Sequence, residues 1–525
     1  MAKAKYKPLS FTTTIRNPER IPAFLKCLSA FEMQILTKDV IRKVVKLVIN
    51  NKLYCPLSLK RSYELKKIWE GEETFSDAQL EQIIIDNPQQ HKEAGFEYGW
   101  ESRFDTWFKF CKELGFIHYS MNAHIMITQT GHMLIDAYTE SPCNEKKVQK
   151  VYLNAFMKYQ TNNPLRKVLN ENAPLPLLLN VIKKLNADPE ENGVGIARHE
   201  LPILICWIDN DSEAVYQYIK NIRKTVGFKC SDEYIYEKCL EILRSDNRNY
   251  FKIDKICYES VDEYIRKMRM SGLLSLRGNG RFLDINKFEE DAANYVIANY
   301  SQYEKFATEK QYIDYMGKID ANILNTKEAS ETETDSVKQK KLKEYAYSYP
   351  KNEIFEELRI ICSKKVRESK DPVLKYIPAP TRLEFLTSIA MLQNFKDLKV
   401  CPNYPVDDEG LPTSTAAGGY SDIECFDSDY DTYCEVTLMC GRTEQVNNEV
   451  IPISRHLQDA IKERRPESFA VLIAPTIHAD TVEACDWQRY KNKIEIIPYN
   501  IDEFIKVISV NRKASDLLNN KPKNT

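Results

Sequence analysis

The stretch 418-GGYSDIECFDSDYDTYCEVTLM-439 decides how the C-terminal part of the chain is expected to fold. It concentrates acidic residues, contains no lysine or arginine, and ends in an apolar, β-branched run. Residues 420–426 and 431–439 predict two strands, and the acids between them crowd the connecting turn. A hairpin of this kind places Asp422, at the start of the first strand, beside Glu435 in the second.

The segments around this hairpin predict a mixed α/β sheet with helices on its faces. Helices are expected at 380–394, 445–465 and 501–511, and further strands at 400–404, 469–474 and 494–498. An amphipathic stretch, KNEIFEELRIICSK, opens this domain, which begins at about residue 345.

Two N-terminal regions share the order helix, glycine, hairpin. In 104–128, apolar residues fall at helical spacing up to Gly115, and two short strands follow. In 261–285, Gly272 ends the helix and the turn Arg-Gly-Asn-Gly joins two strands. This order is typical of winged-helix units, although any α+β domain contains a helix followed by a hairpin. Residues 325–343, polar and segregated in charge, predict a linker or a solvated helix.

Bulk composition limits the function classes. With 525 residues the chain suits several domains, and 43% hydrophobic and 29% charged residues are ordinary for a soluble globular protein. The net charge is −2, so any affinity for DNA must come from local patches. The 14 scattered cysteines indicate reduced thiols in a cytosolic protein. The start MAKAKYKPLSF does not resemble a signal peptide, and no apolar run predicts a membrane span.

The carboxylates point to a hard divalent cation. Mg²⁺ prefers oxygen ligands and keeps several waters, so Asp422 and Glu435 with one further acid suffice to bind it. Glu384, on the preceding helix among apolar neighbours, and Glu449, on the following helix, are candidates to join them. The alternative is that acid runs are solvated loop faces, and this fits the acids at 424–431 well. Three histidines near the first hairpin lack ligand spacing and favour surface or packing roles: His118, His124 and His132.

Asp422 followed by Glu435-Val-Thr437, in the order helix, strand, strand, strand, helix, resembles the PD-(D/E)xK nuclease core. The N-terminal segment TTTIRNPERIP at 12–22 resembles the opening motif of the AlwI-like family of type IIS restriction and nicking endonucleases, to which MlyI and PleI are related. The blocks GYSD at 419–422, CEVTL at 434–438 and ISRHL at 453–457 resemble the same family. The likeness covers nearly the whole chain, with a weaker fit across the middle.

The resemblance implies a multidomain α+β protein with a C-terminal restriction-endonuclease-like catalytic domain. We expect winged-helix-like recognition subdomains at 1–141 and 142–292, a helical linker at 293–344 and the nuclease domain at 345–525. The family's catalytic and metal-binding acids carry over to four residues of this sequence: Glu384, Asp422, Glu435 and, less directly, Glu449. The cofactor implied is Mg²⁺.

One departure from the nuclease motif concerns the residue two positions after the second acid. The motif has a lysine there, and this sequence has Thr437, which carries no positive charge. A second metal bound partly by Glu449 is one candidate to replace the lysine. The other is a residue that positions the attacking water: Glu449, which we favour, Gln445 or His456. Arg442 and Arg455 are candidates to stabilise the scissile phosphate, although an ordinary surface role is as compatible with the sequence.

Candidate DNA contacts lie in several basic segments. The basic residues Lys43, Lys46, Lys60 and Arg61 suit phosphate contacts, or equally a helix kept soluble by its lysines. Arg16, Asn17 and Arg20 lie in a loop-like stretch that suits reading of guanine edges. The helices at 102–114 and 261–271 are candidates for the major groove, and further contacts near the cut come from Lys364, Lys365 and Arg367. The groove-facing candidates are Arg103, Arg266, Lys267 and Arg269.

The expected function is a Mg²⁺-dependent type IIS endonuclease that recognises a short asymmetric site in double-stranded DNA. It is expected to hydrolyse phosphodiester bonds a few nucleotides outside that site, one strand per active site. A double-strand break then needs a transient homodimer or a separate small subunit. The resemblance also implies a companion methyltransferase and a cytoplasmic, prokaryotic setting. The alternatives are a winged-helix DNA-binding regulator with an inactive nuclease-like dimerisation domain, or a scaffold that binds no nucleic acid.

Overall fold

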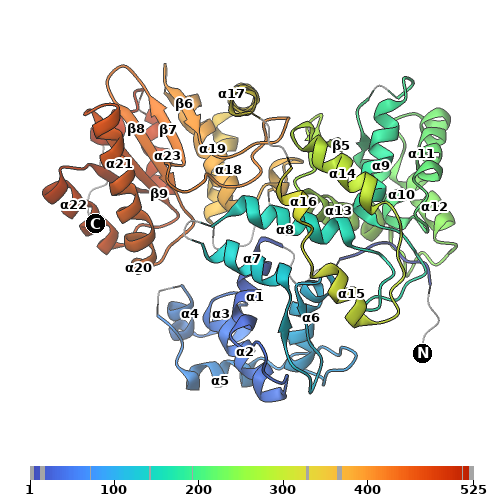
Figure 1. Cartoon of the computed structure of the whole chain (residues 1–525). Coiled ribbons are helices and arrows are strands. Elements are labelled where there is room, and N and C mark those ends of the chain that lie inside the picture. Colours follow the sequence, from blue (N-terminus) through green and yellow to red (C-terminus); the bar gives the residue numbers. More distant parts are fainter. Residues whose placement is uncertain are drawn as a thin grey trace. The chain divides into compact units, whose positions relative to one another are not determined.

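The computed structural model describes residues 5–11, 18–70, 73–140, 143–191, 193–326, 330–363, 369–395, 397–510 and 512–519. The described chain forms two compact units, which can be followed by colour and label in Figure 1. Unit 1 comprises Met1–Arg61, Phe75–Glu140 and Lys146–Ala329, and unit 2 comprises Ser62–Thr74, Ser141–Glu145 and Ser330–Thr525. Each unit is described by itself below.

Unit 1 is mostly helical. Its core is built from amphipathic helices such as α2, which buries Val44, Val45 and Val48 on one face and leaves its charged residues on the other. The helices are α1 (Ile21–Ser29), α2 (Lys38–Asn50), α3 (Leu57–Arg61), α5 (Asp77–Asp86), α6 (Trp100–Glu113), α7 (Gln129–Thr139), α8 (Glu145–Lys158), α9 (Pro174–Ala187), α10 (Leu201–Cys206), α11 (Ser212–Val226), α12 (Asp232–Ile242), α13 (Ser260–Arg269), α14 (Glu290–Tyr300), α15 (Glu309–Met316) and α16 (Ala321–Leu324).

Two small antiparallel sheets follow the helices α6 and α13, as the sequence predicts. After α6, β1 (Ile117–His118) pairs with β2 (Met126–Ile127). After α13, β4 (Leu274–Arg277) pairs with β5 (Phe282–Ile285), and β5 also pairs with β3 (Ile196–Ala197), a strand that the sequence did not predict.

A glycine ends each of these helices for a steric reason. Gly115 and Gly272 both have a φ of +76°, in the region that favours glycine. A Cβ on Gly115 would come within 2.2 Å of the Met316 Cβ, and one on Gly272 within 2.6 Å of the Gln149 side chain. The turn into each hairpin therefore depends on the absence of a side chain.

Unit 2 is built on a five-stranded mixed sheet in the order β10-β9-β8-β7-β6. Its strands are β6 (Lys399–Pro402), β7 (Ile423–Phe426), β8 (Asp431–Val436), β9 (Ser468–Ala474) and β10 (Ile496–Asn500). The pairs β6–β7 and β7–β8 are antiparallel, whereas β8–β9 and β9–β10 are parallel. Strand β8 is buried along its whole length, although its sequence DTYCEV includes the acids Asp431 and Glu435.

Helices cover both faces of this sheet (Figure 1). The core on one face joins Tyr433 and Leu472 of the strands to Val450, Leu457 and Cys485 of the helices above them. On the other face α19 packs against β6 and β8, α23 packs against β9 and β10, and α17 and α18 pack on α19. The helices of unit 2 are α4 (Tyr63–Glu70), α17 (Glu331–Ser348), α18 (Lys351–Cys362), α19 (Ala379–Asn394), α20 (Arg442–Gln445), the π-helical turn η6 (Val446–Val450), α21 (Ile451–Glu463), α22 (Ala479–Asn492), α23 (Ile501–Val510) and α24 (Asp516–Asn519).

Two expectations about this unit need correction. The polar segment 325–343, predicted as a linker or a solvated helix, is helical from residue 331 on, but this helix, α17, packs in unit 2. There Gln339 Nε2 donates to the Val400 carbonyl oxygen at 2.8 Å, and Lys338 Nζ donates to the Pro402 carbonyl oxygen at 3.0 Å. The second correction is α22, a helix that the sequence analysis did not predict between β9 and β10.

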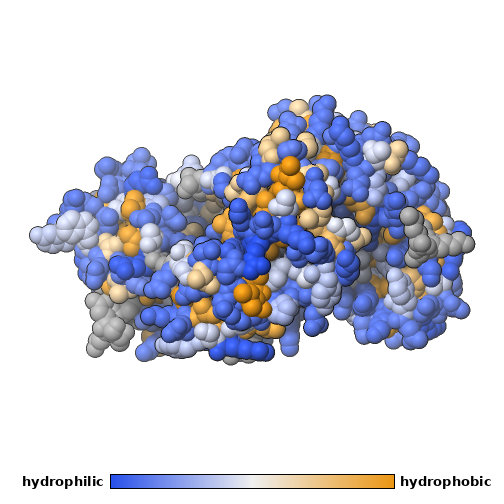
Figure 2. Space-filling model, turned by 90° about the horizontal axis from the view of Figure 1, so that it is seen from below, coloured by the Kyte–Doolittle hydropathy of each residue, from blue (hydrophilic) through white to orange (hydrophobic). Residues whose placement is uncertain are grey.

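The face of the molecule seen in Figure 2 is largely hydrophilic. In the view of Figure 2, hydrophilic residues cover most of the face and hydrophobic residues form scattered small patches. Among the helices of the described ranges, none has the length and apolar content needed to cross a membrane.

Candidate active site

The register of β7 and β8 brings the two motif acids together. Ile423 pairs with Cys434, so the residue before it, Asp422, lies next to Glu435. The Asp422 Oδ2 atom accepts a hydrogen bond from the backbone N–H of Val436 at 2.7 Å. This bond fixes the first acid to the strand that carries the second, as the hairpin predicted from the sequence requires.

Glu384 joins these acids from α19. Its side chain is only 2% exposed, and its Oε2 atom accepts a hydrogen bond from the backbone N–H of Ala416 at 2.9 Å. Glu449 joins them from η6, on the other side of the sheet from α19. Wider π-helical turns of this kind are often found at functional sites. The four acids predicted from the sequence therefore interact at one end of the sheet.

Burial and mutual repulsion disfavour the charged form of all four carboxyls. Burial, followed by the charge of Glu435, raises the pKa of Asp422 well above its usual range. Burial, followed by the charge of Glu449, raises the pKa of Glu435 to about 8, although a hydrogen bond from Ser421 opposes this shift. Burial and then Asp422 raise the pKa of Glu384. A bound cation would remove the repulsion that the four acids share.

Thr437 occupies the place of the motif lysine and contacts Glu449. Burial raises the pKa of Glu449 to about 7, and a hydrogen bond from the Thr437 side chain acts in the opposite direction. The Thr437 hydroxyl oxygen also accepts a hydrogen bond from the Met439 backbone N–H at 3.1 Å. The residue that lacks the positive charge is thus in direct contact with the acid that we favour as its replacement.

The other two candidates to replace the lysine differ in their surroundings. His456 Nδ1 lies 3.3 Å from Glu435 Oε1, while burial and the neighbouring Arg455 lower its pKa. The lowered pKa favours the neutral form of the His456 ring, which carries no positive charge. Gln445 is fully buried and its amide is used by the backbone: its Nε2 donates to the Met439 and Thr476 carbonyl oxygens at 2.9 and 2.7 Å. Gln445 is thus committed to holding the chain after β8.

The donor chemistry fits Mg²⁺, because Asp422, Glu435, Glu384 and Glu449 all offer carboxylate oxygens. In the described ranges, however, no three His, Cys, Asp or Glu side chains already stand in a metal-coordinating arrangement. Side-chain rotation toward a common point is therefore part of any account in which these acids bind a metal.

Of the two phosphate contacts predicted on α2, Lys46 is occupied by acids of α5 and Lys43 is not. Lys46 pairs with Asp77 at 2.7 Å and also with Glu81, which is paired with Arg42 as well. Lys43, Lys60 and Arg61 are exposed, and no carboxylate of the described residues lies within ion-pair distance of them. Of the four residues predicted to contact phosphates, Lys46 is the one already engaged in ion pairs.

The candidate DNA contacts on the two groove-facing helices differ in their burial and in the contacts that they make. Lys267 is 0% exposed, its Nζ donates to Glu263 Oε2 at 3.1 Å, and it lies over the Phe110 ring. Its prediction as a DNA contact is therefore wrong for this structure. Arg103 is half-buried and lies over the ring of Tyr54, to whose hydroxyl oxygen it donates at 3.0 Å. Arg266 and Arg269, on the same helix as Lys267, are partly exposed.

The remaining arginine predictions have mixed outcomes. Arg20 is exposed and donates to the Leu53 carbonyl oxygen. Arg442 is exposed but is paired with Asp480, whereas Arg455 is exposed on α21. The other predicted contacts lie outside the described residues: Arg16, Asn17, Lys364, Lys365 and Arg367.

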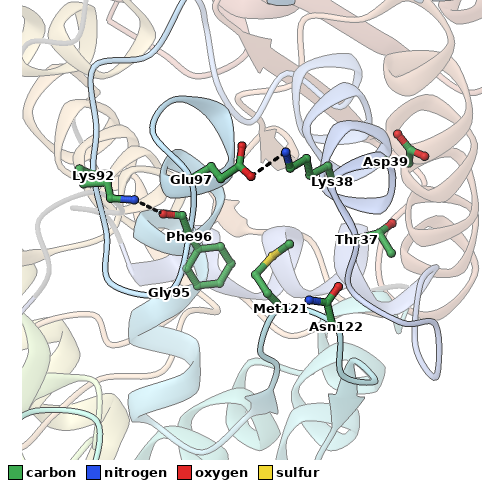
Figure 3. A pocket seen from close by; sticks show the side chains of 9 residues that line it. All are labelled: Thr37, Lys38, Asp39, Lys92, Gly95, Phe96, Glu97, Met121 and Asn122. Carbon is green, nitrogen blue, oxygen red and sulfur yellow. Dashed lines mark hydrogen bonds and ion pairs between the residues drawn. The ribbon is translucent and has the colours of Figure 1, made fainter.

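A pocket of about 660 Å³ lies in unit 1, lined by residues of three segments (Figure 3). Lys38, in the first turn of α2, forms an ion pair of 2.6 Å with Glu97, and Lys92 Nζ donates to the Phe96 carbonyl oxygen at 2.7 Å. None of the predicted site residues lines this pocket. The lining residues are Thr37, Lys38, Asp39, Lys92, Gly95, Phe96, Glu97, Met121 and Asn122.

Sequence reasoning missed two residues that hold the acids in place. Ser421 is buried and hydrogen-bonds the Glu435 carboxyl, and Asn403 donates from its Nδ2 to the Ser421 carbonyl oxygen at 2.7 Å. Ser421 is adjacent to Asp422 in the sequence, so its position could have identified it as a residue of the site. Asn403 lies 18 residues earlier in the chain, and no local pattern links it to the acids.

Comparisons with known proteins give one extended match. The sequence profile of a family described as AlwI restriction endonuclease matches residues 112–346 and 320–507, which together make up most of the chain. Among curated proteins, none matches the chain.

Several solved structures show weak likeness. The small subunit (R.BspD6I2) of the heterodimeric restriction endonuclease R.BspD6I is 21% identical, with a TM-score of 0.25 over 30% of this chain and 76% of that one. The restriction endonuclease FokI is 10% identical, with a TM-score of 0.26 over 98% of both chains. FokI bound to DNA gives 10% identity and a TM-score of 0.22 over 97% of this chain and 96% of that one.

Proposed function

The chain belongs to the AlwI restriction endonuclease family, and from this premise we propose that it is a Mg²⁺-dependent endonuclease of type IIS. It binds a short asymmetric site in double-stranded DNA and hydrolyses phosphodiester bonds a few nucleotides outside that site. The observation that carries the proposal is the interaction of Asp422, Glu435, Glu384 and Glu449 at one end of the sheet in unit 2.

We assign separate roles to the residues of this site. Asp422 and Glu435, with Glu384 and Glu449 as the further acids, hold Mg²⁺, which when bound supplies an activated water and stabilises charge on the phosphate. Glu449, hydrogen-bonded by Thr437, orients the attacking water in place of the motif lysine. His456 hydrogen-bonds Glu435 and keeps its carboxylate oriented. Arg455 is exposed on the adjoining helix and is the better placed of the two arginines to contact a phosphate.

Recognition is assigned to unit 1. The helix–hairpin pairs α6 with β1–β2 and α13 with β4–β5 support a winged-helix character for its two halves. Exposed Lys43, Lys60 and Arg61 suit the phosphate backbone, because their charges have no carboxylate neighbours among the described residues. Arg16, Asn17 and Arg20, with Arg266 and Arg269 on α13, remain the candidates for base contacts.

The wider setting follows from the same family membership. Each chain carries one set of acids, so we propose that a double-strand break needs a transient homodimer or a separate small subunit. A companion methyltransferase that acts on the same site would protect the DNA of the prokaryotic cytoplasm in which the enzyme works.

The test is cleavage of DNA that contains all short sequences, followed by run-off sequencing of the products. With Mg²⁺ the protein is expected to give discrete nicks or cuts at a fixed distance from one motif. Loss of a metal-binding carboxylate removes several kcal/mol of transition-state stabilisation, so Glu435→Gln and Asp422→Asn are expected to slow cleavage roughly 10²- to 10⁴-fold.

Glu424→Gln is the matched control, because Glu424 belongs to the same acidic stretch but pairs at 2.7 Å with Arg464, at the end of α21. It is expected to cleave like the wild type. Normal cleavage by Glu435→Gln, or the absence of discrete products from the wild-type protein, would refute the proposal.

A further inference from the structure

Tyr420 is a large exposed side chain next to the site acids in the sequence. It is 65% exposed and stands two residues before Asp422. Exposure alone is unremarkable for a tyrosine, and Tyr347 of α17 is 95% exposed in the same unit. What distinguishes Tyr420 is the way in which the chain around it is held.

The chain is fixed on both sides of Tyr420 by contacts of the site itself. On the N-terminal side, the Ala416 backbone N–H donates to Glu384 Oε2 at 2.9 Å. On the C-terminal side, Asn403 holds two successive carbonyl oxygens: its Nδ2 donates to that of Ser421 at 2.7 Å, and its backbone N–H donates to that of Asp422 at 2.9 Å. Tyr420 therefore projects from a short span whose two ends are tied to site acids.

The span between these contacts is open to solvent. Residues 417–420 are all exposed, and no described residue accepts a hydrogen bond from their backbone N–H groups. Gly419 has a φ of +96°, and a Cβ placed there would meet nothing within 4 Å. The span thus offers free space, unused backbone donors and one exposed aromatic ring in the segment that leads into Asp422.

On the basis of the proposed function, we infer that Tyr420 is a substrate-contact residue whose ring stacks on a base next to the scissile phosphate. Every base has a π-face, so an aromatic ring binds nucleotides of any sequence. This tolerance is what an enzyme needs when it cuts outside its recognition site, where the sequence varies. The fixed ends of the span set the position of the ring relative to Asp422 and Glu384, and so the position of the phosphate that enters the site.

The test combines protein variants with altered DNA. Tyr420→Ala, Tyr420→Phe and the control Tyr347→Ala are compared on a duplex that contains the mapped cut position. A second set of duplexes lacks one base, as an abasic nucleotide, on either side of the scissile phosphate. Binding is measured by fluorescence anisotropy without metal, and cleavage by single-turnover kinetics with Mg²⁺. Circular dichroism and urea unfolding confirm that the variants fold.

On intact DNA, Tyr420→Ala is expected to bind and cleave at least ten-fold less well than the wild type. Tyr420→Phe is expected to stay within about three-fold, because its ring remains able to stack. Tyr347→Ala is expected to match the wild type. Removal of the base at one of the two positions is expected to weaken binding and cleavage by the wild type as much as the Tyr420→Ala substitution does. The same abasic position is expected to weaken binding and cleavage by Tyr420→Ala no further.

Other outcomes overturn the inference. If the wild type cleaves and Tyr420→Ala cleaves equally well, Tyr420 has no role while the proposed function stands. If the substitution and the abasic positions act independently, or if Tyr420→Phe loses as much as Tyr420→Ala, the ring does not stack on a base. If the wild type cleaves no DNA, the proposed function fails and this inference falls with it.

Discussion

Thr437 shows how a single position defines the chemical problem of the site. A threonine in place of the motif lysine removes a cation, and the lowered pKa of the neighbouring His456 favours the neutral form of its ring. The hydrogen bond from Thr437 instead favours the charged form of Glu449. A carboxylate is able to accept a proton from the attacking water, whereas a lysine ammonium only donates.

Glu449→Gln is therefore expected to slow single-turnover cleavage by roughly 10²-fold, the lower range for loss of a positioned acid–base group. DNA binding without metal should be unchanged, because the amide keeps the shape of the side chain. Glu444→Gln, an exposed acid of α20, is the control and should cleave normally. Equal cleavage rates for Glu449→Gln and the wild type would show that another group orients the attacking water.

Lys158 is a second residue whose surroundings change its chemistry. It is 5% exposed, and its Nζ donates to the carbonyl oxygens of Tyr315 and Lys318. Burial lowers its pKa to about 8. Between this value and the ordinary lysine pKa of about 10.4, the unfolded chain binds more protons than the folded one, so the contribution of Lys158 to stability rises with pH.

Urea unfolding at pH 7.5 and pH 10 tests this sign. The free energy of unfolding of the wild type relative to Lys158→Met is expected to increase by roughly 1 to 3 kcal/mol over that range. Because both proteins contain the same cysteines and tyrosines, the pH-dependent contributions of these residues cancel in the difference between the two free energies of unfolding. Lys310→Met, at an exposed lysine of α15, should show no such pH-dependent difference. A flat or falling difference for Lys158→Met would contradict the assignment.

At the scale of elements, a buried ion cluster ties α11 to the segment around β3. Arg223 donates to both carboxylate oxygens of Glu200 at 2.7 Å and to Glu191 at 2.8 Å, and all three side chains are buried. Its guanidinium also donates to the Gly195 carbonyl oxygen at 3.2 Å. Loss of the arginine would leave two buried carboxylates without their common partner.

Arg223→Ala is expected to destabilise unit 1 by about 3 to 5 kcal/mol, the usual result of removing one partner from a buried ion pair. Lys224→Ala, at the next residue of the same helix, removes an exposed pair with Glu190 and should cost less than about 1 kcal/mol. Chemical unfolding followed by tryptophan fluorescence provides the comparison. Similar losses for the two variants would show that the cluster contributes little.

Some elements were predictable from the sequence because their patterns are local. The strands β6–β10 and the helix α19 follow the predicted order, since alternation and apolar spacing survive in any context. Helix α22 was missed because it buries only Thr481 and Cys485 and has no continuous apolar face. Lys267 was misjudged because its burial depends on the Phe110 ring of another helix, which no local pattern reveals.

At the scale of the whole molecule, the sequence identified the four acids as candidate metal ligands, but it did not predict which residues they contact. Asp422 and Glu435 follow from the hairpin register, whereas the partners of Glu384 and Glu449 depend on how helices from both faces meet the sheet. The domain boundaries expected at 141 and 292 stay a prediction within unit 1. The division near residue 330 is displaced from the predicted 345, because α17 packs on α19 and β6.

One set of acids per chain predicts the order of products. Nicked circular plasmid is expected to form before any linear product, at a rate proportional to protein concentration. Linear product should then depend more steeply on concentration if a second copy supplies the other active site. A time course on agarose gels over a hundred-fold range of concentration provides the measurement. Linear DNA without a nicked intermediate would contradict the assignment of one strand per active site.

The contacts of α17 with β6 close one side of the nuclease sheet. In an edge strand, the outward carbonyl oxygens are the groups that recruit a strand from another chain. The carbonyl oxygens of Val400 and Pro402 already accept hydrogen bonds from Gln339 and Lys338. A partner cannot extend the sheet at this edge while α17 stays in place, so β6 is protected from strand exchange and from fibre-like self-association.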